Sequence, residues 1–290
     1  MNSSANLVAL YTITRREIMR VVRIWSQTLI PPVITMTLYF VIFGKLVGSR
    51  IGTIEHGFTY IQYLAPGLVM MSIINNSYAN ISSSFFGAKF QRSVEEMLVS
   101  PMPNWVILLG YVAGSVARGL VVGALVLGVA LFFTSLHVTH PLVMLLSVIL
   151  GATIFALAGF VNAIYAKKFD DIALVPTFVL TPLTYLGGVF YSVNMLKEPW
   201  QAISRANPIL YMVNTFRFGV IGVSDVGVAT GFAVMIGFVA GLSILALQLL
   251  KRGVGLRSYT GAVACASTNT SAKPACARAV RRTSCWSPGG

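Results

Sequence analysis

The chain has 290 residues, of which 56% are hydrophobic and only 10% are charged, and its mean hydropathy is +0.78. A soluble domain carries about 25% charged residues, so this composition excludes a water-soluble globule, and it also excludes a disordered or collagen-like chain. It indicates a protein that crosses a membrane several times. The formal net charge of +13 is therefore interpreted first as basic residues retained in cytoplasmic loops, rather than as a nucleic-acid-binding surface.

The N-terminal segment, residues 7–25, predicts an amphipathic helix that lies in the headgroup region of the cytoplasmic leaflet. Arg16, Arg20 and Arg23 share one face of this helix, and apolar side chains occupy the opposite face. The helix could be a topology anchor or an element that carries force into the first span, and the sequence leaves both interpretations open.

Six apolar segments follow, each long enough to cross a bilayer, which requires about 20 residues per helix. Pro31 and Pro32 are expected at the start of the first, because proline fits the first turn of a helix better than its middle. The six segments cover residues 27–47, 60–83, 105–136, 142–165, 172–193 and 226–250.

The second segment carries Ser72, Asn76, Asn80 and Ser83 at helical spacing, so one stripe of it is polar. Amide groups inside a membrane must be satisfied by a neighbouring helix or by a hydrated path, and packing between helices is the preferred interpretation. Asn76, Asn80 and Thr181 are nevertheless our candidates for lining a transport path, on the ground of their polarity alone.

The loop between the second and third segments predicts a short charged helix that Pro101 and Pro103 terminate. This helix could be a solvated connector, or it could dock into the groove of a partner protein. Its charged residues are Lys89, Arg92, Glu95 and Glu96, and Phe86, Phe90, Val94 and Met97 lie on its other side.

The third segment contains Arg118, which would be costly at the middle of a membrane. Because the segment is longer than one span requires, we expect Arg118 in its cytoplasmic third, with the side chain extending to the membrane surface. Small-residue motifs typical of helix packing occur here and in the sixth segment, but they identify no function. They are Gly110-x3-Gly114, Gly119-x3-Gly123 and Gly237-x3-Gly241.

The fifth segment is expected to kink or break at Pro176, Pro182 and the Gly187-Gly188 pair. Residues 197–222, which follow it, are too many for a hairpin turn and too apolar for an ordinary loop. Since prolines interrupt them, they predict two short helices that dip back into the outer leaflet as a re-entrant hairpin. The overall expectation is an all-α membrane protein with six transmembrane helices, an N-terminal amphipathic interfacial helix, and this hairpin between helices 5 and 6.

Charge predicts the orientation of these spans. With six spans both chain ends lie on one side of the membrane, where eleven basic residues fall, against five on the other side. The positive-inside rule therefore predicts cytoplasmic termini. A cleavable signal peptide is not expected, because the first apolar run begins too far from the N-terminus and no small-residue cleavage site follows it.

Several kinds of chemistry are missing from the sequence. No Asp or Glu falls inside an apolar segment, which disfavours an ion-coupled carrier or an intramembrane hydrolase. No phosphate-binding loop, zinc motif or nucleophile turn occurs. His137 and His140 form a pair without a third ligand, so neither a metal site nor a cofactor is expected. Energy for uphill transport would have to come from another subunit.

Three stretches give the chain a family resemblance over residues 5–257. They are the Arg-rich N-terminal helix, the loop from Arg92 to Pro101, and the segment from Pro182 through Gly187-Gly188 to Tyr191, and the downstream stretch from Trp200 to Asn207-Pro208 together with Arg217 completes the resemblance. The chain resembles the permease subunit of ABC-2-type transporters, bacterial export permeases that work with a separate ATPase. The resemblance implies an inner-membrane exporter of two permeases and two ATPase subunits, in which ATP is bound by the partner.

The resemblance also implies roles for particular residues. The loop helix would be the coupling helix, so that Arg92, Glu95 and Glu96 contact the ATPase. The hairpin would close the external side of the path, and its residues are Trp200, Asn207, Pro208 and Tyr211. A non-transport scaffold or assembly factor is the alternative function, and a secondary carrier is a third.

The C-terminal residues 259–290 depart from the family. All three cysteines, Cys265, Cys276 and Cys285, lie in this stretch, so no disulfide or Cys-ligated metal can belong to the preceding permease domain, residues 1–258. The tail is expected to be disordered, and the preferred interpretation is a non-native, frameshifted or read-through end. A genuine basic tail that binds anionic lipid is the alternative.

Overall fold

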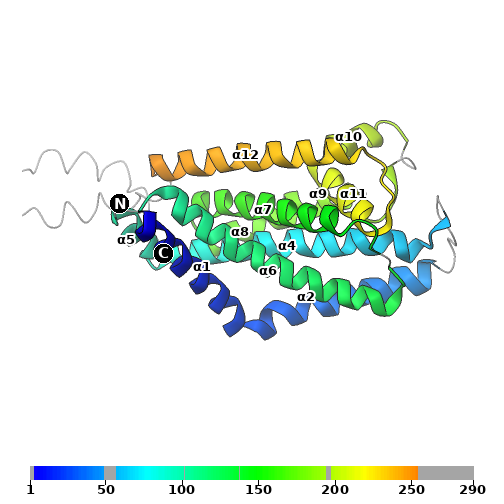
Figure 1. Ribbon diagram of the computed structural model, residues 1–290, viewed down its shortest axis with the longest axis horizontal. Helices are drawn as coiled ribbons and strands as arrows, with labels where there is room; N and C mark the ends of the chain where they lie inside the picture. Colours follow the sequence, from blue (N-terminus) through cyan, green and yellow to red (C-terminus); the bar gives the residue numbers. More distant parts are fainter. Residues whose placement is uncertain (1–2, 49–56, 101, 137, 194–196, 254–290) are drawn as a thin grey trace, which may run out of the picture.

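A computed structural model of the chain describes residues 3–48, 57–100, 102–136, 138–193 and 197–253. His56, His137, the three cysteines and the predicted tail 259–290 lie outside the described residues. The described part is a bundle of helices that run roughly along one axis (Figure 1). The first residues of α1, the short helix α5 and the last turn of α12 lie at one end, called here the α5 end. Helices α10 and α11 lie toward the opposite end, called the α10 end.

Four helices of the described part are long and apolar enough to cross a membrane, so the protein is a multi-pass membrane protein. They are Trp25–Gly44, Asn104–Phe133 (α6), Pro141–Tyr165 (α7) and Val228–Arg252 (α12). The all-helical class is confirmed, while six spans and a re-entrant hairpin remain predictions. The second predicted segment is α4 (Tyr60–Phe90), a 31-residue helix that packs against both α6 and α7. Its polar stripe makes it less apolar on average than α6, α7 and α12.

The N-terminal region forms α1 (Ser3–Arg23), then α2 (Trp25–Tyr39) and the π-helical segment η1 (Phe40–Val47). The expectation that Pro31 and Pro32 start the first span is wrong, because both lie inside α2. Each proline removes a single backbone hydrogen bond, and membrane helices tolerate such a loss. The chain changes direction instead at the boundary between α1 and α2 (Figure 1).

The predicted break of the fifth segment is confirmed. Its residues form α8 (Phe169–Val175), the π-helical η3 (Pro176–Leu180) and α9 (Thr181–Tyr185). The Asp171 carboxylate begins α8 by accepting hydrogen bonds from the backbone N–H groups of Lys167 (2.8 Å) and Lys168 (2.9 Å), and these bonds lower the pKa of Asp171. Pro176 and Pro182 then begin the two segments that follow.

The stretch after the fifth segment contains two short helices, as predicted. These are α10 (Trp200–Ala206) and α11 (Pro208–Ile221), separated at Asn207. Helix α11 is largely buried and packs against α4, α7 and α12. It is therefore part of the helix bundle rather than a peripheral loop.

The charged loop helix is shorter than the charge spacing predicts. Helix α4 continues to Phe90, so Lys89 belongs to α4, and α5 comprises only Ser93–Val99. Arg92 separates the two helices in a left-handed conformation (φ +60°). Helix α5 ends before Pro103, and α6 begins at Asn104, while Pro101 lies outside the described residues.

The two small-residue motifs of α6 are packing sites. Ile13 of α1 lies against Gly110, where an added Cβ would come within 2.6 Å of its side chain, and Glu17 of α1 lies against Gly114. Gly119 and Gly123 face α4 in the same way. Glycine thus allows α6 to approach both α1 and α4 closely. The third motif differs, because an added Cβ at Gly237 or Gly241 of α12 would meet no atom within 4 Å.

Candidate functional site

Near the α5 end, one buried carboxylate organises the contact of α1 with α4. Glu17 is only 2% exposed, and its position against Gly114 brings it within reach of α4. Its Oε2 accepts hydrogen bonds from Ser84 Oγ at 2.5 Å and from Arg20 Nε at 3.3 Å. Arg16 Nη2 lies 3.5 Å from the other carboxylate oxygen. A buried carboxylate requires such partners, because removal from water destabilises an unpaired charge.

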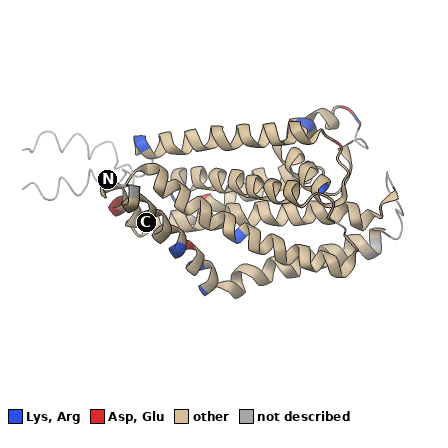
Figure 2. Cartoon of the chain, in the orientation of Figure 1, with Lys and Arg blue, Asp and Glu red and all other residues tan. Residues whose placement is uncertain are grey.

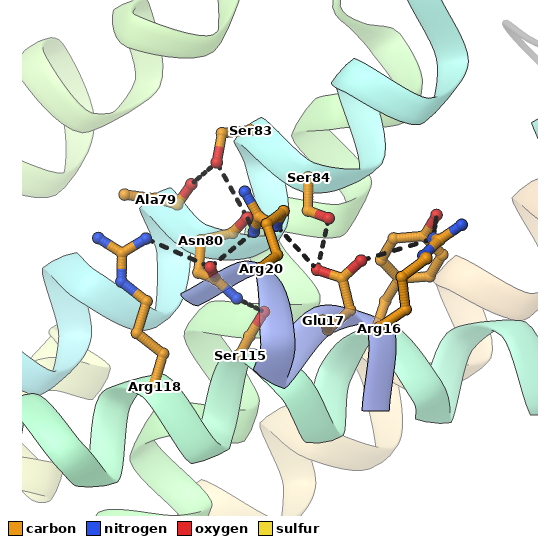
Figure 3. Close-up of polar contacts among 10 residues, drawn as sticks. Arg16, Glu17, Arg20, Ala79, Asn80, Ser83, Ser84, Ser115 and Arg118 are labelled. Carbon is orange, nitrogen blue, oxygen red and sulfur yellow. Dashed lines mark hydrogen bonds and ion pairs between the residues drawn. The ribbon is translucent and has the colours of Figure 1, made fainter. Parts of the chain in front are cut away.

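The same set of contacts continues to α6 through Asn80. Arg20 Nη2 donates to the Asn80 side-chain oxygen at 2.7 Å and to its backbone carbonyl at 3.2 Å. Asn80 Nδ2 donates to Ser115 Oγ of α6 at 3.0 Å. Figure 3 shows that α1, α4 and α6 all contribute side chains to this group. We name it the Glu17 cluster, and its residues are Arg16, Glu17, Arg20, Asn76, Asn80, Ser84, Ser115 and Arg118.

Arg118 does not extend toward the membrane surface as expected. Its guanidinium turns toward α4, where Nη1 donates to Asn80 Oδ1 at 3.2 Å (Figure 3). Nη2 donates to Asn76 Oδ1 at 3.3 Å. The side-chain amides of Asn76 and Asn80 accept hydrogen bonds from the guanidinium and so replace water as its partners. The spacing of residues along α6 does not reveal these partners, because both lie on α4. Arg118 and Arg20 therefore share one amide oxygen.

The three residues proposed to line a path do not form one group. Asn76 and Asn80 are buried together in the Glu17 cluster, which agrees with the packing interpretation of the polar stripe. Thr181 is exposed at the start of α9, and its hydroxyl donates to the carbonyl of Pro176. A role in lining a path stays a prediction for all three residues.

The residues predicted to contact the ATPase lie in or directly before the short helix α5, which packs against the bundle through its first turn. Glu95 and Glu96 occupy the first turn of α5, and Arg92 immediately precedes it. Figure 2 shows the acidic residues of this short helix at the α5 end of the bundle. Val94 of α5 is only 1% exposed, whereas Val99 at its end is 87% exposed. Next to α5, Lys89 Nζ donates to the carbonyls of Ile164 (2.7 Å) and Ala166 (2.8 Å), and thereby joins the end of α4 to the end of α7.

A second polar group lies at the α10 end. Arg217 of α11 is completely buried, and its Nη1 and Nη2 donate at 2.8 Å to the Tyr63 hydroxyl and to the Gly188 carbonyl. The guanidinium also lies 3.8 Å from the centre of the Tyr63 ring. The Tyr63 hydroxyl donates in turn to Asp225 Oδ2 at 3.0 Å, so a hydroxyl connects the buried cation to a carboxylate. We name Tyr63, Gly188, Ser192, Asn214, Arg217 and Asp225 the Arg217 cluster.

The predicted hairpin residues have structural roles around this cluster. Asn207 Nδ2 donates to the Leu183 carbonyl, and its side-chain oxygen accepts from the backbone N–H of Ile209, which starts α11 just after Pro208. The Tyr211 hydroxyl donates to the Arg205 carbonyl and so joins α11 to α10. Trp200, by contrast, is 54% exposed at the start of α10.

Sequence reasoning missed Glu17, Tyr63 and Asp225. Glu17 had a usable signal, because it is three residues from Arg20 and shares a helical face with Ile13, which is also buried. Asp225 is a lone acid directly before the sixth apolar segment, which is a position that could have been noted. Tyr63 had no distinguishing signal, since its role depends on the approach of Arg217 from a distant helix.

Comparison with known proteins finds relatives over most of the chain. Residues 8–221 match the family model described as the ABC-2 type transporter. The chain is 57% identical over 251 residues to the inner membrane transport permease YadH of Escherichia coli (strain K12), covering 87% of this chain and 98% of that protein. It is 24% identical over 213 residues to nodulation protein J of Rhizobium leguminosarum bv. viciae, covering 72% of this chain and 81% of that protein.

Proposed function

The chain belongs to the ABC-2 type transporter family, and from this premise we propose that it is the permease subunit of an ATP-driven exporter in the bacterial inner membrane. It is a multi-pass membrane transport permease, and thus a transporter rather than a catalytic enzyme by itself. The family implies an ATPase partner subunit. In our proposal that partner binds ATP, both termini of this chain are cytoplasmic, and two copies of the permease assemble with two ATPase subunits.

The single observation that carries the proposal is the position of α5. This helix presents Glu95 and Glu96 in its first turn at one end of the bundle, with its apolar side anchored through buried Val94. It follows directly from α4, the helix that contacts both α6 and α7. A partner that moves α5 would therefore displace α4, which is the arrangement a coupling helix requires. We assign Arg92, Glu95 and Glu96 to the contact with the ATPase.

The other elements fit the same proposal. Helices α10 and α11, with Trp200, Asn207, Pro208 and Tyr211, form the external hairpin that closes the path. Asn76, Asn80 and Thr181 supply polar groups to the path when the helices rearrange. The substrate that suits amides, hydroxyls and aromatic side chains is an amphipathic, lipid-like or drug-like molecule, moved out of the cytoplasm.

The test is a paired measurement on the purified complex of permease and ATPase in lipid. The double variant Glu95→Ala and Glu96→Ala is expected to reduce permease-stimulated ATP hydrolysis by about tenfold or to dissociate the ATPase, because charged contacts at an interface contribute both affinity and register. Asp170→Ala on α8 is the matched control, since Asp170 is an exposed acid in the first turn of another short helix. Unchanged assembly and unchanged hydrolysis in the double variant would remove the coupling role.

The alternatives predict different results in the same preparation. A scaffold or assembly factor would bind no ATPase and move no substrate. A secondary carrier would move substrate in ATP-free vesicles under an ion gradient alone. ATP-dependent accumulation in inside-out vesicles would exclude both alternatives and would establish the direction of transport.

A further inference from the structure

A cleft with charged, polar and apolar side chains in its lining lies between α1 and the turn that joins α4 to α5, beside the Glu17 cluster. Its volume is about 470 Å³, and its lining includes Arg16, Arg20, Arg23, Ser83, Gln91 and Ser93. Small-molecule sites commonly measure about 300–1,000 Å³, so the cleft can hold a headgroup-sized ligand. Arginine, hydroxyl and amide donors converge there from two separate helices and the turn between α4 and α5.

The charges around the cleft do not balance. Three arginines and one carboxylate, that of Glu17, line it, which leaves two positive charges in excess. Glu17 is shared by Ser84, Arg20 and Arg16, and Nη2 of Arg16 also donates to the Tyr111 hydroxyl at 2.6 Å. Arg23 has no hydrogen bond or ion pair within the described part of the chain, and it is exposed. Because the effective dielectric constant near a protein surface is lower than that of bulk water, a group of guanidinium charges in excess of carboxylates favours a bound anion.

A further cation lies behind the cleft. Arg118 and Arg20 both donate to the Asn80 side-chain oxygen, so the two guanidinium groups approach each other with a neutral amide between them (Figure 3). Like charges in such a position repel, and an anion in the cleft would offset the repulsion. Oxygens of a phosphate group suit this arrangement, because guanidinium groups bind phosphate through paired hydrogen bonds.

The apolar side of α1 indicates where the remainder of the ligand lies. Met19 lines the cleft and is 54% exposed, and Val22 and Trp25 continue the exposed apolar surface along α1 and the start of α2. Exposed side chains of this kind on an amphipathic helix contact acyl chains, and tryptophan is enriched at the headgroup level. A ligand with both a phosphate and acyl chains satisfies both surfaces.

We propose that this cleft binds the phosphate of one anionic phospholipid from the cytoplasmic leaflet, with Arg16 and Arg23 as its principal ligands. The bound lipid fixes α1 against the turn before α5 and neutralises the excess charge there. The proposal rests on the proposed function only in placing the α5 end at the cytoplasmic surface of the membrane.

The experiment titrates the purified full-length chain in detergent with phosphatidylglycerol or with phosphatidylcholine and counts bound lipids by native mass spectrometry. One phosphatidylglycerol is expected to bind more tightly than any phosphatidylcholine. Arg23→Gln is expected to weaken that lipid about fivefold, since one basic residue near a charged membrane surface contributes that much. Arg16→Gln should act in the same direction.

The control is Arg15→Gln, which removes the same charge from an exposed position on the same helix outside the cleft, and which should leave binding within about twofold. Thermal midpoints of all variants show whether each remains folded. Equal losses in Arg15→Gln and Arg23→Gln, or equal binding of both lipids, would overturn the proposal. Displacement of the lipid by inorganic phosphate at equal concentration would show a free-anion site instead and would overturn the lipid assignment. No ATP or ATPase is present, so these outcomes are independent of the coupling test.

Discussion

Two charged side chains are withdrawn from water near opposite ends of the bundle, and each has a different kind of compensation. Glu17 is paired with arginines that are themselves partly exposed, at 47% for the side chain of Arg16 and 31% for that of Arg20. Arg217 is fully buried, and its two terminal nitrogens donate to a hydroxyl and a carbonyl while its guanidinium lies over an aromatic ring. We therefore expect substitution of Arg217 to be the more destabilising, because nothing around it can be rehydrated without opening the bundle.

Arg217→Met tests this expectation. The variant leaves the Gly188 carbonyl without its donor and removes the cation that Tyr63 connects to Asp225. We expect a loss of roughly 3–5 kcal/mol in unfolding free energy, the range for removing one member of a buried charged group. The measurement is the apparent thermal midpoint of the purified protein. Arg205→Met is the control, because Arg205 is exposed on the neighbouring helix α10. Equal midpoints for the two variants would show that the Arg217 contacts contribute little.

Glu17→Ala and Glu17→Gln separate charge from hydrogen bonding at the other cluster. The glutamine retains an acceptor for Ser84 Oγ but loses the attraction to Arg16 and Arg20, whereas the alanine loses both. We expect a loss of about 1–3 kcal/mol for the alanine and a smaller loss for the glutamine. Thermal midpoints measured alongside Glu198→Ala, an exposed acid, check the order. A glutamine variant as unstable as the alanine would assign the whole effect to charge.

At the scale of elements, glycine positions on α6 decide which helices can approach it. Gly114 faces Glu17 of α1, while Gly128, two heptads further along the same helix, has no atom within 4 Å of an added Cβ. The same substitution at these positions should therefore have opposite effects. Alanine is favoured over glycine in a helix by about 1 kcal/mol wherever space allows it.

Gly128→Ala is accordingly expected to leave stability unchanged or to raise it, and Gly114→Ala is expected to lower it by about 1–3 kcal/mol through displacement of α1. Thermal midpoints give the sign of each effect, and protease sensitivity of the N-terminal segment reports whether α1 has moved. A stabilising Gly114→Ala would mean that α1 does not pack on α6 in the membrane.

Sequence reasoning was most successful where the determining signal is local. Pro176, Pro182 and Pro208 act on their own backbone, so the broken fifth segment and the two short helices after it could be predicted. Pro31 and Pro32 misled the prediction, because whether a helix tolerates proline depends on its surroundings. The turn of Arg118 toward Asn76 depends on a helix distant in sequence, and no spacing along α6 contains that information.

At the scale of the whole molecule, the ends of the chain can be located without engineering the wild-type protein. All three cysteines are at or after position 265, so a thiol reagent reports on the C-terminal segment alone. We expect a membrane-impermeant maleimide to label inside-out vesicles but not intact cells. The control is a variant with all three cysteines changed to serine and with Ser135→Cys added, which should show the reverse pattern, since Ser135 is exposed between α6 and α7. Labelling of the wild type in intact cells would contradict the proposed topology.

Helix α4 has a consequence for how distant parts of the molecule communicate. It is a single helix from Tyr60 to Phe90, roughly 46 Å long at 1.5 Å per residue, and it contributes Tyr63 to one cluster and Asn76, Asn80 and Ser84 to the other. Rotation or translation of such a rod changes both clusters at once, so their equilibria are linked. Thermodynamic linkage is reciprocal. If nucleotide at the partner ATPase changes the affinity of this chain for a molecule that separates Tyr63 from Arg217, then that molecule must change the affinity for nucleotide by the same factor.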